Sequence, residues 1–197
     1  DKPGRRVSSF RAGDRVADMT IVGAYSEYIC LPAENLIRVP ESLDSSEVVA
    51  LILSYMTAYQ MLHRIARISE GKSILVHGAS GAVGIALLQL GKLLNLEVYG
   101  TASAPKHELV EKHGGKPIDY KKENFRRRIH ELTNGGVDAV FDPIGGENFK
   151  RSFQSLKPGG KLVAFGFYNA VMDKGGSIPM DYMKMMLWDI MPNQKKA

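Results

Sequence analysis

The residues with the clearest chemical potential lie in 74–84, which read Ile-Leu-Val-His-Gly-Ala-Ser-Gly-Ala-Val-Gly. An apolar run, 74–76, is followed by three glycines, Gly78, Gly81 and Gly84, and then by apolar residues at helical spacing. A glycine turn between a strand and a helix lets backbone N–H groups approach a phosphate, and the helix N-terminus adds partial positive charge. We therefore expect this turn to bind the pyrophosphate of a dinucleotide.

The turn departs from the usual G-x-G-x-x-G pattern. Ala79 stands at the first glycine position, whereas Gly81 and Gly84 are in register. A plain strand-to-helix turn is therefore the alternative interpretation. A Walker A phosphate loop is disfavoured, because Gly-Lys-Ser at 71–73 precedes the strand instead of following it, and Ala66 replaces the first glycine.

The choice of dinucleotide depends on residues 100–106, Gly-Thr-Ala-Ser-Ala-Pro-Lys. An NAD site usually has a carboxylate about 20 residues after the glycines, which binds the ribose 2′-hydroxyl. This stretch has no carboxylate, and Thr101, Ser103 and Lys106 offer two hydroxyls and an ammonium instead. Such donors suit a 2′-phosphate. The sequence thus favours NADPH over NADH, the alternative being that these side chains only decorate a solvated turn.

The elements around these residues alternate regularly. The expected strands are 74–76, 97–99, 117–118, 137–141 and 161–165, and the expected helices are 82–94, 105–113, 123–132 and 146–156. This alternation predicts an α/β fold with a doubly wound parallel sheet covered on both faces. A Pro-Gly-Gly turn at 158–160 is expected to separate the last helix from the last strand. Upstream, 47–68 predicts a largely buried helical segment with a possible break near Ser54, and 1–40 predicts β structure, including a strand at 24–29.

Composition is that of an ordinary globular protein, with 44% hydrophobic and 24% charged residues. No apolar run approaches the roughly 20 residues of a membrane span, and no signal-peptide pattern is present, so we expect a cytoplasmic protein. Cys30 is the one cysteine, and the five histidines lack ligand spacing, so no metal site is expected. The net charge is +5. The basic cluster at 121–128 reads as the solvated face of a helix that buries Phe125 and Ile129, in preference to a nucleic-acid site.

Several segments together resemble the medium-chain dehydrogenase/reductase superfamily, in its zinc-independent quinone oxidoreductase branch. In chain order they are 13–16, 23–28, 57–59, 76–84, 101–103 with Lys106, 119–120, 142–146 and 160–166. Relatives begin upstream and continue past Ala197, so the chain is expected to be partial. The resemblance implies a partial, β-rich GroES-like catalytic domain over 1–44 and a Rossmann dinucleotide-binding domain over 45–197, with the last strand missing.

The resemblance also implies an activity. It predicts an NADPH-dependent oxidoreductase, acting as a homodimer without zinc, that transfers a hydride to a small-molecule quinone or activated alkene (enone). No membrane or nucleic-acid partner is expected, and the catalytic residues are not identified. Two alternatives stay open: an enoyl-thioester reductase, or an NADPH-binding regulatory or RNA-binding protein without turnover. A short-chain reductase is disfavoured because the sequence has no Tyr-x-x-x-Lys pair.

The resemblance finally assigns cofactor contacts to individual positions. It places 80–83 at the pyrophosphate, Ser103 and Lys106 at the 2′-phosphate, and Tyr120 beside that phosphate. The predicted cofactor-binding residues are Thr57, Ser80, Gly81, Ala82, Val83, Thr101, Ser103, Lys106, Tyr120, Phe165 and Gly166. Thr57 and the last two are expected near the nicotinamide. Pro143 departs from relatives that carry serine there, so a side-chain contact is lost.

Overall fold

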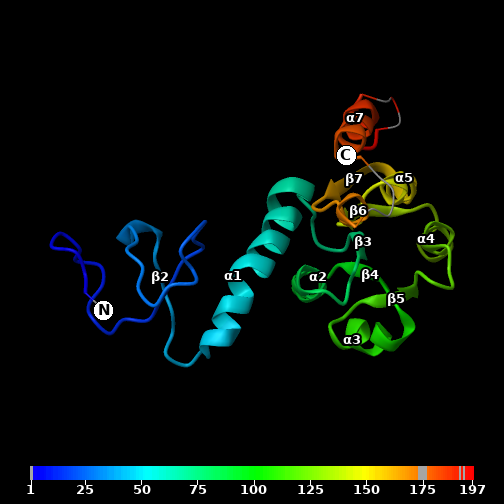
Figure 1. Cartoon of the computed structure of the whole chain (residues 1–197). Coiled ribbons are helices and arrows are strands. Elements are labelled where there is room, and N and C mark those ends of the chain that lie inside the picture. The colour runs from blue at the N-terminus through cyan, green and yellow to red at the C-terminus, as the bar shows by residue number, and fades with distance from the viewer. Residues whose placement is uncertain (1, 173–176, 191, 193) are drawn as a thin grey trace. The chain divides into compact units, whose positions relative to one another are not determined.

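A computed structural model of the protein describes residues 2–172, 177–190, 192 and 194–197 (Figure 1). The chain forms two compact units, Asp1–Met56 and Thr57–Ala197. The boundary between them falls inside helix α1 (Ser45–Gln60). None of the described helices combines the length and hydropathy needed to cross a bilayer.

The first unit contains little regular structure. Strand β1 (Val16–Ala17) pairs antiparallel with β2 (Ile37–Arg38), and a short 3-10 helix, η1 (Ala33–Asn35), precedes β2. The strand expected at 24–29 is wrong, because that segment forms turns and loop. Tyr25 and Tyr28 are exposed there, so their β propensity is not supported by packing against a neighbouring strand.

Helix α1 is continuous through Ser54, so the expected break there is wrong. The helical path changes later, in a π-helical segment, η2 (Met61–Ala66), that ends at Arg67 in the left-handed conformation. The prediction that this region is largely buried is also wrong for most of α1, where Val49 is 70% exposed and Leu53 63% exposed. Apolar residues occur on all sides of α1, and a single packing face can cover just one stripe of a helix.

The second unit is built on a five-stranded parallel sheet in the order β5-β4-β3-β6-β7. The strands are β3 (Ser73–His77), β4 (Glu97–Ala102), β5 (Lys116–Asp119), β6 (Val137–Asp142) and β7 (Leu156–Ala164). The chain moves outward from β3 to β5, then returns to the other side of β3. This order confirms the predicted doubly wound α/β fold and places a topological switch point between β3 and β6.

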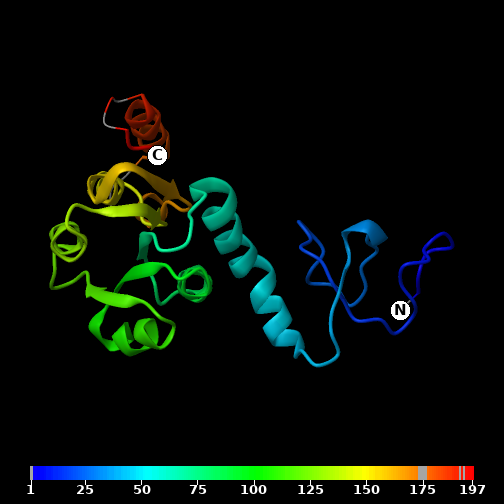
Figure 2. The same ribbon diagram turned by 180° about the vertical axis from the view of Figure 1, so that it is seen from behind.

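Four helices connect the strands: α2 (Ala82–Leu93), α3 (His107–Lys112), α4 (Phe125–Thr133) and α5 (Glu147–Gln154). A 3-10 turn, η3 (Ala104–Lys106), precedes α3. Helices α2 and α3 cover one face of the sheet and α4 and α5 the other, as the two opposite views show (Figure 1, Figure 2). Right-handed crossovers on either side of β3 require this arrangement.

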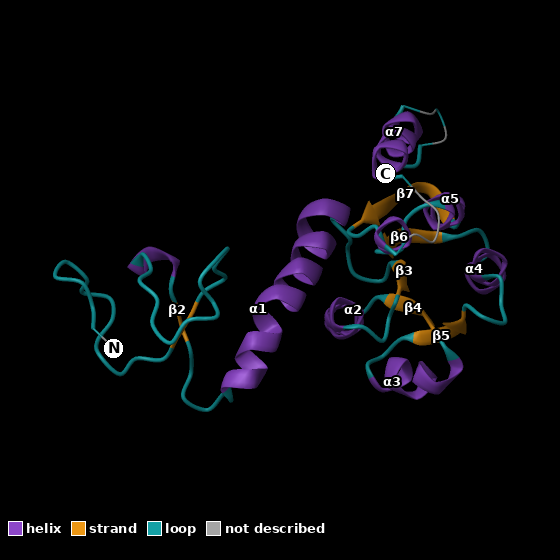
Figure 3. Cartoon of the chain, in the orientation of Figure 1, coloured by secondary structure: helices purple, strands orange, loops and turns teal. Residues whose placement is uncertain are grey.

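The expected position of the turn before the last strand is wrong. The Pro-Gly-Gly sequence at 158–160 lies within β7 and not before it, at a register irregularity opposite Val137 and Ala139. Gly159 has φ +80°, which suits a bulged residue. The short helix α6 (Tyr168–Val171) and helix α7 (Ile178–Asp189) follow β7 (Figure 3). Lys196 then forms an isolated parallel bridge with Lys161 of β7.

One large part of the core lies between the sheet and helices α4 and α5. Leu75 of β3 and Val140 of β6 are fully buried, and Ile129 and Phe149 pack on the same cluster. Helix α4 therefore buries one side and exposes the arginines at 126–128, which confirms the predicted solvated face. This packing fixes the carboxyl ends of β3, β4 and β6 relative to α5.

Candidate dinucleotide site

The glycine turn joins β3 to α2 with the geometry that an anion requires. Gly78 has φ +63°, and its carbonyl accepts a 2.9 Å hydrogen bond from the Gly81 N–H. Gly81 is the N-cap residue of α2 and provides no side-chain cap. The first N–H groups of a helix have no partner within the helix. Those of Ala82 and Val83 can therefore bind a phosphate at the positive end of α2.

Close packing explains the small residues of this turn. A Cβ added at Gly84 would lie 2.7 Å from Ala79 Cα, so the helix can approach the turn only with glycine there. A Cβ added at Gly100 would lie 2.6 Å from the methyl group of Ala79. Ala79 stands where the usual pattern has glycine, and its methyl group fits because the neighbouring residue on β4 is Gly100. At Gly81 an added Cβ would approach only the Gly78 carbonyl, at 3.3 Å.

A cavity of about 480 Å³ opens beside the turn, at the carboxyl ends of β3 and β4. Its lining residues are His77, Gly78, Ser80, Thr101, Ala102, Ser103, Tyr120, Phe125, Ile144, Asn148, Arg151, Tyr168 and Asn169. These described residues include no carboxylate, and Arg151 is the one with a permanent charge. Hydroxyl, amide and guanidinium donors beside an uncapped helix fit the phosphates of a dinucleotide.

The structure brings most of the predicted site residues together. Ser80, Thr101, Ser103 and Tyr120 line the cavity, and residues 81–83 form the adjoining start of α2. These positions come from three different segments that meet because β3, β4 and β5 are neighbours in the sheet.

The other four predicted residues lie outside both the cavity lining and the start of α2. Lys106 is exposed at the end of η3, and Thr57 belongs to α1. Phe165 and Gly166 follow β7 and contact the end of β6: the Phe165 N–H donates to the Asp142 carbonyl at 3.1 Å. A Cβ added at Gly166 would lie 2.9 Å from the Pro143 carbonyl oxygen.

A buried hydrogen-bond relay of Asp142, Ser152, His77 and Thr101 lies beneath the cavity. The Ser152 hydroxyl donates to Asp142 Oδ2 at 2.6 Å and lies 3.0 Å from His77 Nε2. His77 Nδ1 lies 3.0 Å from Thr101 Oγ1. Because the Ser152 proton is directed to the carboxylate, its oxygen accepts from His77 Nε2–H. A neutral imidazole then accepts at Nδ1, so the Thr101 hydroxyl donates to His77.

Burial favours the neutral form of His77. The side chain is 3% exposed, and burial lowers its pKa. The Asp142 carboxylate raises that pKa, whereas the Arg151 guanidinium lowers it. The imidazole and the Phe125 ring also pack in a T-shaped arrangement, with 4.5 Å between centroids. These contacts make His77 a packed residue, and it lies beside the cavity because it is the last residue of β3.

The opposite wall of the cavity is held by contacts around Asp142 and α5. Asp142 is fully buried, and its carboxylate accepts hydrogen bonds from the Ile144 N–H at 2.7 Å and from Asn148 Nδ2 at 2.9 Å. Further along, the Asn169 N–H donates to the Ile144 carbonyl at 2.8 Å. Asp181 of α7 accepts the Gly146 N–H at 2.9 Å. The wall is thus hydrogen-bonded to two later segments of the chain, α6 and α7.

Sequence reasoning missed the α5 residues of the site, Asn148 and Arg151. The available signal was their spacing: with Ser152 they lie three and four residues apart, which places them on one helix face. Tyr168 and Asn169 carry no such signal, because only the return of the chain after β7 brings them to the cavity. The described residues contain no group of three His, Cys, Asp or Glu side chains arranged to hold a metal ion.

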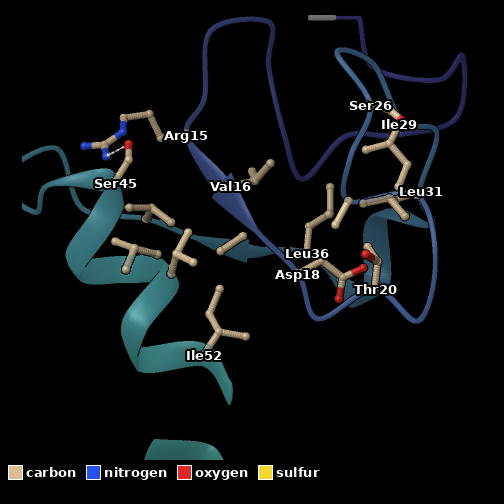
Figure 4. A pocket seen from close by; sticks show the side chains of 16 residues that line it. Arg15, Val16, Asp18, Thr20, Ser26, Ile29, Leu31, Leu36, Ser45 and Ile52 are labelled. Atoms are coloured by element: carbon tan, nitrogen blue, oxygen red, sulfur yellow. Dashed lines mark hydrogen bonds between the residues drawn. The ribbon is translucent and has the colours of Figure 1, made fainter. Parts of the chain in front are cut away.

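A second cavity, also about 480 Å³, lies in the first unit (Figure 4). Its walls are mainly apolar and include Val16, Leu36 and Ile52. Arg15 Nη2 donates to Ser45 Oγ at 3.1 Å, and Nη1 donates to backbone carbonyls at 40 and 41. None of the predicted cofactor-binding residues lines this cavity.

Comparison with known proteins identifies the family. The family described as zinc-binding dehydrogenase matches residues 82–190, from the first residue of α2 to the residue after α7. The quinone oxidoreductase of Pseudomonas aeruginosa is 38% identical over 167 residues, covering 83% of this chain and 51% of that protein. The Escherichia coli quinone oxidoreductase complexed with NADPH has a TM-score of 0.76 and 28% identity, over 86% of this chain and 56% of that one. The chain belongs to the medium-chain dehydrogenase/reductase superfamily, in its quinone oxidoreductase-like branch.

Other members of the superfamily match equally long segments. The synaptic vesicle membrane protein VAT-1 homolog of Rattus norvegicus is 39% identical over 168 residues, covering 84% of this chain and 42% of that protein. The chain therefore spans about half the length of the relatives it matches. The superfamily assignment agrees with the parallel sheet and with the glycine turn at the start of α2.

Proposed function

We propose that this chain forms the cofactor-binding part of an NADPH-dependent reductase that transfers a hydride to a quinone or an activated alkene such as an enone. The observation that carries the proposal is the cavity beside the uncapped start of α2. Its described lining offers hydrogen-bond donors and one cation but no carboxylate. The quinone oxidoreductases among its relatives support the same activity.

Individual residues take binding roles in this proposal. The N–H groups of Ala82 and Val83 bind the pyrophosphate, while Ser103 and Tyr120 donate to the 2′-phosphate. Thr101 does not donate to that phosphate, because its proton is directed to His77. When bound, the nicotinamide supplies the hydride. The chain contributes its position, by holding both ends of the adenine nucleotide against the carboxyl edge of the sheet.

We further propose that the reductase works without zinc and as a homodimer. Cys30 is the one cysteine of the sequence, so a multi-cysteine zinc site cannot form within it. Elemental analysis of the purified protein should find no stoichiometric zinc, and a chelator should leave turnover unchanged. Light scattering should give twice the mass of one chain. One zinc per subunit, or a monomer at all concentrations, would contradict these two statements.

NADPH oxidation with a panel of acceptors tests the proposed activity. The panel contains a benzoquinone, an enone and an enoyl thioester, with Gly81→Val as the variant expected not to bind the cofactor. We expect turnover with the quinone or the enone, faster with NADPH than with NADH. Turnover confined to the thioester would favour an enoyl-thioester reductase. NADPH binding without any turnover would favour a regulatory protein.

A further inference from the structure

Arg151 is a cationic residue in the wall of the dinucleotide cavity, and the proposed function gives it no role. It lies on α5, is half-buried, and places its guanidinium 4.3 Å from the centre of the Phe125 ring. Among the described residues no carboxylate pairs with it, and no hydrogen bond to another side chain uses its fork of N–H donors. This cation–π contact does not use the N–H donors of the guanidinium in hydrogen bonds, so they are available to a ligand.

The other basic side chains of this region differ from Arg151. On α4, Arg127 binds Glu131 at 2.8 Å, and Arg126 donates to Gln154 at 2.6 Å. Lys106, the cation that the sequence predicted for the phosphate, is exposed and does not line the cavity. The Arg151 guanidinium has no ion pair among the described residues, so its positive charge can attract an anionic ligand. The cavity therefore suits an anion that reaches α5.

The position of Arg151 indicates which anion this is. It shares the cavity with Ser103, which follows β4, and with Tyr120, which follows β5. Its supporting ring, Phe125, begins α4, on the face of the sheet opposite α2. The pyrophosphate is expected at the start of α2, where backbone N–H groups can donate hydrogen bonds to it. The remaining phosphate of NADPH is the one on the adenosine ribose.

We propose that Arg151 binds the 2′-phosphate of NADPH and is the main cationic determinant of NADPH selectivity, ahead of Lys106. The assignment rests on the proposed function and names a recognition residue for it. The planar guanidinium matches two phosphate oxygens, and Ser103 and Tyr120 complete the donor set. Asn148, one helical turn before Arg151, lines the same wall while donating to Asp142.

Calorimetric titration of the whole chain with 2′,5′-ADP and with 5′-AMP tests the assignment without requiring turnover. Arg151→Gln should weaken 2′,5′-ADP about ten- to hundredfold, the scale of a lost charge-assisted hydrogen bond, and change 5′-AMP less than about threefold. Lys150→Gln removes the same charge from the neighbouring exposed residue outside the cavity and should change neither. Arg151→Lys should fall between Arg151→Gln and the parent, because it keeps the charge without the fork. Lys106→Ala should weaken 2′,5′-ADP less than Arg151→Gln does.

The outcomes separate this assignment from the proposed function. If the parent protein binds 2′,5′-ADP and Arg151→Gln binds it equally well, the assignment fails while the proposed function stands. Equal losses for both nucleotides, or for NADPH and NADH, would move Arg151 to another part of the cofactor or to a structural role and also overturn it. A parent that binds neither 2′,5′-ADP nor NADPH contradicts the proposed function and the assignment together. Thermal melting of each variant confirms that it is folded.

Discussion

His77 Nε2 lies 3.0 Å from Ser152 Oγ, so the end of β3 is hydrogen-bonded to α5 beneath the dinucleotide cavity. The same imidazole reaches Thr101 at the end of β4, and Ser152 reaches Asp142 at the end of β6. Three neighbouring strand ends are therefore joined through two buried side chains, His77 and Ser152. This relay fixes the floor of the cavity before any ligand arrives.

Ser152→Ala should destabilise the protein. It leaves His77 Nε2–H without an acceptor in the buried relay, which costs about 1–3 kcal/mol of unfolding free energy. Ser155→Ala is the matched control: the Ser155 hydroxyl donates to the Arg151 carbonyl, which also accepts the Ser155 N–H. Urea unfolding should therefore give a smaller loss for Ser155→Ala. Equal losses would mean that the relay contributes nothing beyond an ordinary buried hydroxyl.

Stability should depend on pH through His77. Burial lowers the folded-state pKa of His77 below its unfolded value of about 6.5, so the unfolded state binds the extra proton. The stabilisation is complete above pH about 6.5 and is lost as pH falls towards the folded-state pKa, by at most about 1.4 kcal/mol per pH unit. Unfolding measured between pH 7 and about 4.5 should show this slope, and His77→Gln should flatten it. An unchanged slope in the variant would rule out His77 as its origin.

The two glycines of the turn should respond differently to substitution. Gly84→Ala places a methyl group 2.7 Å from Ala79 Cα, and this overpacking should cost about 1–3 kcal/mol of stability. Gly81→Ala has only the Gly78 carbonyl nearby, at 3.3 Å, and a φ of −84° that alanine adopts freely. It should keep its melting temperature within a few degrees of the parent and lose dinucleotide affinity. Gly81→Ala with unchanged affinity would reduce the glycine sequence to a plain turn.

Asp181, which lies outside the cavity lining, should stabilise the cavity wall through its hydrogen bond to Gly146. It is 1% exposed and accepts the Gly146 N–H at the start of α5. Asp181→Ala leaves that buried N–H unpaired and should cost about 1–3 kcal/mol, whereas Asp181→Asn keeps an acceptor and should cost less. Chemical unfolding of both variants checks the difference. If alanine and asparagine behave alike, the hydrogen bond to Gly146 is not what Asp181 contributes.

The sequence was sufficient for the sheet and for the glycine turn, because both depend on local patterns. Apolar runs of strand length between helical segments give the doubly wound order, and Gly84 reflects a contact with a turn only five residues earlier. The 158–160 turn was misplaced because a bulged strand and a turn use the same residues. The exposure of α1 could not be predicted, since apolar composition does not specify which surface covers it.

Only some of the residues that line the cavity could be predicted from the sequence. Ser103 and Tyr120 belong to recognisable segments, but the pairing of His77 with Thr101 depends on the register of β3 and β4. The role of Arg151 could not be predicted, because it depends on the lack of an ion pair between Arg151 and any described carboxylate. The lack of an ion pair can be recognised only once the positions of α4, α5 and the strand ends are known.

Titration of the purified chain with NADPH and NADH, followed by the change in nicotinamide fluorescence, tests the central claim most directly. A cavity that offers hydroxyl and guanidinium donors and no described carboxylate should bind NADPH at least about tenfold more tightly than NADH, the scale of one charge-assisted contact. Gly81→Val should bind neither. Equal affinities, tighter NADH binding, or no binding of either dinucleotide would contradict the account.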